Sequence, residues 1–96
     1  MTRKELVLIK HREAIRAAAA RHRCRSIALV GSVARGEDSQ ESDYDFLADF
    51  EKGVTLFDQC GLQAALEDLL GSEVDVVPRS SIRESYQNMY DDAIKL

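Results

Sequence analysis

The chain has 96 residues, of which 45% are hydrophobic and 31% charged, so we expect one small domain over residues 1–96 with a modest core. Its net charge is -4, and this acidic excess argues against binding of nucleic acid over the whole surface. Residues 1–25 are nevertheless basic, with eight Lys or Arg against two Glu. This segment fits either the solvated face of a helix or a basic arm.

The cysteines and the opening segment exclude further classes. Cys24 and Cys60 share no metal-ligand spacing with the two histidines, which favours reduced thiols over a zinc site or a disulfide. The opening apolar run has four residues, too few for a signal peptide or a membrane span. We therefore expect a cytoplasmic protein.

The first half of the chain predicts a helix, a strand and a polar loop. Apolar residues and an alanine run predict a helix over residues 3–22. The apolar run over residues 27–30 predicts a strand that ends at Gly31. Residues 32–42 are polar and rich in turn formers, so they predict one short helical turn followed by a loop.

The second half predicts two strands around the clearest helix. Residues 44–50 read as a strand, and residues 55–70 as a helix that Thr55 caps and Gly71 follows at C′. The run over residues 72–78 predicts a third strand, ended by its proline.

A capping-box pattern, Ser81 followed by Glu84, predicts a last helix. Its apolar positions at helical offsets are Ile82, Tyr86, Met89, Tyr90 and Ala93. The element order predicts an α/β fold in which helices cover a small sheet.

Three carboxylates carry the candidate chemistry. Residues i and i+2 of a strand point to the same face, so Asp43 and Asp45 are expected to project side by side. If the last two strands are neighbours, Asp75 completes the cluster, and Glu73 is a weaker candidate for the same place. Crowded carboxylates repel each other unless cations lie between them, and Mg²⁺ prefers carboxylate and phosphate oxygens. Such a cluster can hold two metals for phosphoryl or nucleotidyl transfer.

The turn before these carboxylates suits a phosphate. Gly31 allows the backbone to approach a phosphate closely, and Ser32 offers a hydroxyl and an N–H. Arg35 is near enough in sequence to pair with a phosphate or a carboxylate.

The stretch "GSVARGEDSQESDYD", residues 31–45, resembles the signature of the DNA polymerase β-like nucleotidyltransferase superfamily. The short chain and the "GS-x-ARG" form resemble the minimal nucleotidyltransferase (MNT) proteins, best known as antitoxins of HEPN/MNT toxin–antitoxin pairs. The resemblance implies the nucleotidyltransferase (polymerase β-like) fold, a small mixed β-sheet packed with helices. Every expected position is filled, which argues for an active enzyme.

The resemblance also implies a reaction. The nucleotide is ATP with two Mg²⁺ ions, and Gly31 and Ser32 hold the triphosphate. Asp43 and Asp45 bind both metals, while Asp75 binds the catalytic metal and helps to deprotonate the acceptor hydroxyl. The acceptor is a tyrosine of a partner HEPN ribonuclease toxin, and the products are an AMP ester and pyrophosphate. Arg35 contacts the nucleotide or the partner, or forms a salt bridge with a neighbouring acidic residue.

A protein acceptor agrees with the chain length, because few residues remain beyond the third strand to build an acceptor pocket. The predicted last helix, with its two tyrosines, offers a docking surface. Three other functions stay open. They are an antitoxin that acts by binding alone, a small-molecule nucleotidyltransferase of the aminoglycoside-modifying kind, and a nucleic-acid module that uses the basic first helix.

Overall fold

A four-stranded mixed sheet organises the protein, with the strand order β3-β2-β1-β4. The computed structural model describes residues 1–81 and 92–96. The strands are β1 (Cys24–Val30), β2 (Tyr44–Phe50), β3 (Val74–Pro78) and β4 (Ile94–Lys95). Strand β1 is antiparallel to both β2 and β4, whereas β2 and β3 are parallel.

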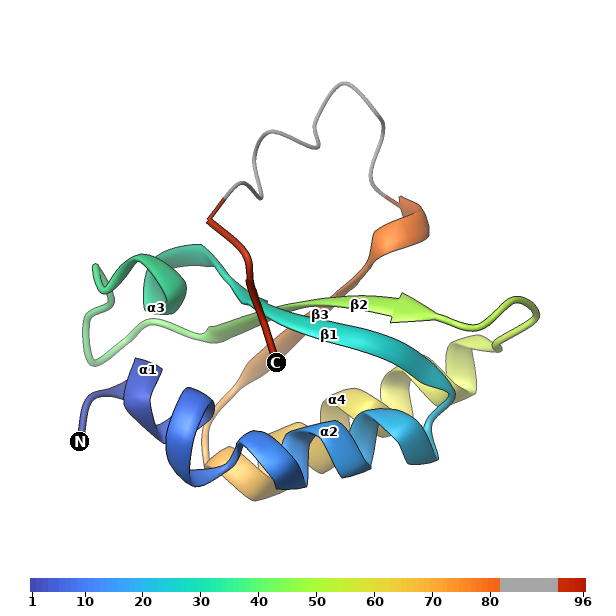
Figure 1. Ribbon diagram of the computed structural model, residues 1–96, viewed down its shortest axis with the longest axis horizontal. Coiled ribbons are helices and arrows are strands. Elements are labelled where there is room, and N and C mark those ends of the chain that lie inside the picture. The colour runs from blue at the N-terminus through green and yellow to red at the C-terminus, as the bar shows by residue number, and fades with distance from the viewer. Residues whose placement is uncertain (82–91) are drawn as a thin grey trace.

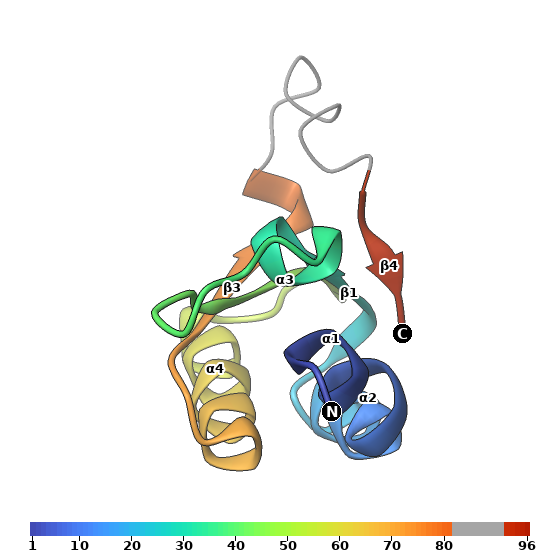
Figure 2. The ribbon, with the colours of Figure 1, turned by 90° about the vertical axis from the view of Figure 1, so that its left-hand side faces the viewer.

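Helices precede and connect these strands. They are α1 (Arg3–Glu5), the π-helix η1 (Leu6–Lys10), α2 (Arg12–Arg21), α3 (Gly31–Arg35), α4 (Leu56–Leu70) and the 3₁₀ helix η2 (Arg79–Ser81). Figures 1 and 2 show α2 and α4 side by side against one face of the sheet, with α3 at one end of the strands. In the described part of the chain, no helix is long and apolar enough to cross a membrane.

The core lies between the sheet and these two long helices. Alternate residues of β2 face it, so Phe46 and Ala48 are fully buried while Asp45 and Asp49 belong to the opposite face. From α4, Leu62 and Leu66 are fully buried against the sheet. The face of the sheet that carries the acidic side chains is therefore left free of α2 and α4.

The helix predicted over residues 3–22 is interrupted. The backbone N–H of His11 donates to the carbonyl of Leu6, five residues earlier, which closes a π-helical turn before α2 begins. Hydrophobic spacing did not reveal this break because the adjacent residues Val7 and Leu8 are both apolar and both pack against the core, so either could continue the apolar stripe. The fully buried Val7 lies within η1 and anchors it to the core.

The first strand is longer than predicted, since it begins at Cys24 rather than at residue 27. Cys24 pairs with Phe50, and the register shifts between Cys24 and Ser26. Residues 24–26 include polar side chains, so the sequence did not predict a strand there, and they are extended because they pair with β2.

The last predicted helix falls mostly on residues 82–91, outside the described residues. At its predicted start, Ser81 closes η2, and its hydroxyl donates to the carbonyl of Pro78 (2.7 Å). At its predicted end, Ala93 is not helical, and the next two residues form β4, which the sequence did not predict.

Candidate active site

The strands place two of the predicted carboxylates opposite each other. In the parallel pair β2–β3, Asp45 is the direct partner of Asp75, and across the antiparallel pair it faces Val30, the last residue of β1. Asp43 lies just before β2 begins and is half-buried, as is Asp45, whereas Asp75 is exposed. The strands thus bring Asp45 beside Asp75, and Asp43 lies two residues before Asp45, where β1 ends and β2 begins.

The electrostatics of Asp45 show how closely these groups are placed. Burial raises the pKa of its carboxyl, and the negative charges of Asp75 and Asp43 raise it further. The Arg35 guanidinium acts in the opposite direction and lowers the same pKa. A cation held between these carboxylates would relieve the repulsion that raises the pKa.

Gly31 lies directly against the side chain of Asp45. Gly31 begins α3 with a φ of +77°, in the left-handed region that favours glycine. A Cβ on Gly31 would lie 2.5 Å from Oδ2 of Asp45 and 3.2 Å from its Cβ and Cγ. The absence of a side chain therefore lets the turn after β1 lie against the carboxylate.

Ser32 and Arg35 extend the site along α3. Ser32 is partly exposed beside Gly31, and its carbonyl accepts a hydrogen bond from the Glu37 N–H (2.9 Å). Nε of Arg35 pairs with Oε2 of Glu37 at 3.1 Å. Of the roles expected for Arg35, the salt bridge to a neighbouring acidic residue is present, and its charge also reaches Asp45.

The donor set fits magnesium, although it does not form a closed cage. In residues 1–81 and 92–96, no three His, Cys, Asp or Glu side chains converge into a group that could enclose a metal ion. Mg²⁺ commonly uses one or two carboxylates, several waters and the substrate's phosphates. The register pair Asp45–Asp75 would supply carboxylate oxygens for such a partial site from neighbouring strands.

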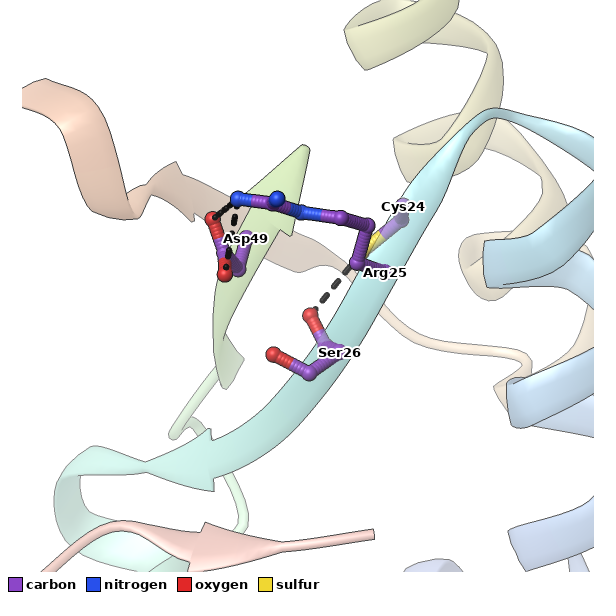
Figure 3. A network of polar contacts seen from close by, with 4 residues as sticks. All are labelled: Cys24, Arg25, Ser26 and Asp49. Atoms are coloured by element: carbon purple, nitrogen blue, oxygen red, sulfur yellow. Dashed lines mark hydrogen bonds and ion pairs between the residues drawn. The ribbon is translucent and has the colours of Figure 1, made fainter. Parts of the chain in front are cut away.

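Asp49, a second carboxylate of β2, forms an ion pair with an arginine of the neighbouring strand. Asp49 lies four residues beyond Asp45 on the same strand, and NH2 of Arg25 contacts both of its oxygens, at 3.2 and 3.4 Å. Figure 3 shows this pair beside the contact between Sγ of Cys24 and the carbonyl of Ser26 (3.0 Å). Asp49 therefore has a cationic partner within the chain.

One residue of the site was missed by sequence reasoning. Arg3 donates from its guanidinium to the carbonyls of Ser42 and Gln40 and lies over the ring of Tyr44. It is far from these residues in sequence, and no local pattern links them, so only the folded chain could reveal the contact.

Comparisons with known proteins identify the family of this chain. The model of the family described as "Nucleotidyltransferase domain" matches residues 9–95. The chain belongs to the nucleotidyltransferase domain family. The predicted fold and enzyme class are thereby confirmed, and so is the resemblance to minimal nucleotidyltransferases.

Individual relatives support the same conclusion. Protein adenylyltransferase MntA of Thermococcus cleftensis is 39% identical over 79 residues, which are 82% of this chain and 77% of the relative. A solved structure provisionally named a minimal nucleotidyltransferase is 41% identical, with a TM-score of 0.83, and the match covers 93% of this chain and 92% of that chain. A crystal structure of the toxin–antitoxin MntA-HpeT is 19% identical with a TM-score of 0.72, covers 86% of this chain and 69% of that chain, and shows the shared fold.

Proposed function

We propose that this nucleotidyltransferase is a protein adenylyltransferase antitoxin that transfers AMP from ATP to a tyrosine hydroxyl of a partner HEPN ribonuclease toxin and thereby silences it. The observation that carries the proposal is the register pair Asp45–Asp75 beside the Gly31 turn. Supporting it, several relatives bear the name protein adenylyltransferase, and a fold neighbour named MntA was solved with a toxin. The reaction is assigned to the cytoplasm, and the chain acts as one domain over residues 1–96.

Each group of the site has a role in this proposal. Gly31 and Ser32 hold the triphosphate through the backbone of the turn and the hydroxyl. Asp43, Asp45 and Asp75 hold two Mg²⁺ ions, which when bound offset the charge on the phosphates and favour departure of pyrophosphate. Arg35, paired with Glu37, lies at the edge of the same site and contributes positive charge toward the nucleotide.

The acceptor hydroxyl is deprotonated by Asp75, which is exposed and therefore within reach of a group that a second protein brings. The hydroxyl oxygen of the tyrosine forms a bond to the α-phosphorus of ATP, and the bond from that phosphorus to the oxygen that bridges the α- and β-phosphates breaks. The proton goes to Asp75, and the electron pair leaves with pyrophosphate. The parallel register keeps Asp75 beside Asp45, so deprotonation and phosphate binding occur at adjacent positions.

The test is the intact mass of the co-purified toxin after incubation with this protein, ATP and MgCl₂. A mass gain in whole AMP units is expected with the wild type, and none with Asp43→Asn/Asp45→Asn. Asp49→Asn is the matched control, since it removes a carboxylate from the same strand whose partner is Arg25. Peptide mapping then identifies the modified residue.

Three outcomes would contradict the proposal in different ways. A stable complex without mass gain would favour neutralisation by binding alone. AMP transfer to a small hydroxyl compound without the toxin would favour the small-molecule enzyme. Loss of transfer in Asp49→Asn as well as in the double variant would place the chemistry elsewhere on the sheet.

A further inference from the structure

We infer that Arg3 is a positioning residue of the active site, which holds the backbone before Asp43 and the side chain of Tyr44 after it. The inference rests on the proposed function for its catalytic consequence, but its structural core can be tested without nucleotide or partner. It starts from a set of contacts that joins the first helix to the loop before β2.

The contacts of Arg3 bracket Asp43. Its NH1 donates to the carbonyl of Ser42, the residue directly before Asp43, and NH2 donates to the carbonyl of Gln40 at 2.7 Å. Its Cζ lies 5.5 Å from the ring centroid of Tyr44, the residue directly after Asp43, in cation–π geometry. A planar guanidinium can make these contacts together because its N–H groups diverge in a fixed fork.

Arg3 is itself held firmly. Thr2 and Glu5 form a capping box at the start of α1: the Glu5 N–H donates to Oγ1 of Thr2 (3.1 Å), and the Thr2 N–H donates to Oε1 of Glu5 (3.2 Å). The next helical segment carries Val7, which is fully buried in the core. Arg3 therefore belongs to a capped helical turn that continues into a segment anchored by a buried residue.

The loop that Arg3 holds has few other attachments. Within it, the Ser42 N–H donates to the carbonyl of Ser39 (3.1 Å), and the Ser39 N–H donates to Oγ of Ser42 (2.9 Å). These bonds stabilise the local turn but tie it to nothing else. Among the hydrogen bonds of the described residues, those from Arg3 alone connect Gln40 and Ser42 to another element of the fold.

This attachment matters because the carboxylates repel one another. Asp43 lies two residues before Asp45, whose register partner is Asp75, and like charges this close repel one another. The hydrogen bonds from Arg3 hold the backbone before Asp43 against that repulsion. None of the ion pairs in the described part of the chain involves Arg3, so its donors serve carbonyl oxygens rather than a carboxylate.

The test compares Arg3→Met with a matched control, Arg12→Met, using ¹⁵N-labelled protein without nucleotide. Arg12 also donates from α2 to a carbonyl of another element, that of Lys95 at 3.2 Å, but away from the site. NMR amide exchange is followed at Ser39 and Ser42, whose N–H groups are hydrogen-bonded inside the loop. The amide of Leu66 in α4 reports global opening.

In Arg3→Met, exchange at the two serine amides is expected to accelerate about tenfold, because hydrogen bonds from a charged donor are lost. Leu66 and the Arg12→Met protein should exchange as the wild type does. Arg3→Lys should be intermediate, since an ammonium keeps the charge but not the fork. Unchanged serine exchange, or equal acceleration at Leu66, would overturn the inference.

The second part of the test measures the steady-state rate at which the intact protein transfers AMP to its toxin. Arg3→Met should lower kcat about tenfold with little change in KM for ATP, because Gly31 and Ser32 are untouched. If the wild type transfers no AMP, the proposed function fails while amide exchange still decides the role of Arg3. If transfer is normal in Arg3→Met despite a loosened loop, the positioning role is refuted.

Discussion

Replacing Gly31 with alanine tests the contact that shapes the site. The new Cβ would lie 2.5 Å from Oδ2 of Asp45, which is closer than real Cβ atoms approach other atoms. The carboxylate must therefore rotate away from its place opposite Asp75. A misplacement of about 1 Å near a reacting centre can reduce the rate about 100-fold, so we expect at least that loss of AMP transfer.

The expected loss of stability has two parts. Alanine at a φ of +77° destabilises the fold by about 1–2 kcal/mol, and forcing Asp45 off its rotamer adds about 0.5–1.5 kcal/mol. Gly71→Ala is the matched control. Its φ is +65° and a Cβ there would meet nothing within 4 Å, so it should show the backbone part alone.

The assay is urea unfolding of the metal-free protein, combined with the toxin mass shift. Gly31→Ala should be less stable than Gly71→Ala by about 1 kcal/mol, and adding Asp45→Ala should remove most of that difference, because Oδ2 at 2.5 Å is gone while the Cβ of residue 45 at 3.2 Å stays. Equal stabilities of the two single variants, together with full AMP transfer by Gly31→Ala, would refute the reasoning.

Other substitutions test the electrostatics, the chemistry and the packing. The pKa of Asp45 is raised above its ordinary value of 3.8, so between these two pKa values the folded state binds more protons than the unfolded state, and the free energy of unfolding falls as pH rises. Asp45→Asn should therefore be more stable than the wild type at pH 7, and the difference in their free energies of unfolding in urea should shrink toward acid pH. A difference that is the same at every pH would exclude this cause. Asp75→Asn should reduce the initial rate of AMP transfer about 10²–10⁴-fold while Asp49→Asn keeps it, and the reverse order would exclude Asp75 as the base. Gly61→Ala should lower the melting temperature, because its Cβ would lie 2.8 Å from Cε1 of His22. In a His22→Ala background the same substitution should instead stabilise α4 by up to about 1 kcal/mol, and a change of stability in the same direction in both backgrounds would contradict the contact.

Short-range rules predicted part of the local structure around the candidate site. The end of the first strand before Gly31 was correct, whereas the shared face of Asp43 and Asp45 stays a prediction, because β2 begins only at Tyr44. The bounds predicted for α4 were also correct, since Thr55 caps its start by accepting from the Asp58 N–H and Gly71 ends it in the left-handed conformation.

The long-range features could not be predicted in the same way. The pairing of Asp45 with Asp75 depends on which residues align when β3 pairs parallel to β2. The sequence predicted that Asp75 joins the cluster only if these two strands are neighbours. Arg3 reaches the loop before Asp43 from the far end of the chain, which no periodicity encodes. Strand β4 was missed because its residues continue a stretch with apolar helical spacing, so pairing with β1 overrides the local pattern there.

The length of the connection between α4 and β3 determines which residue of β3 lies opposite Asp45. Only three residues, 71–73, separate the end of α4 from the start of β3. Because neighbouring strand residues face opposite sides, deleting one of them would turn Asp75 toward the α4 side and bring a valine to the acidic face. Related chains could therefore exchange many surface residues of α4 freely, but an insertion or deletion in this connection would inactivate the site even with every aspartate retained.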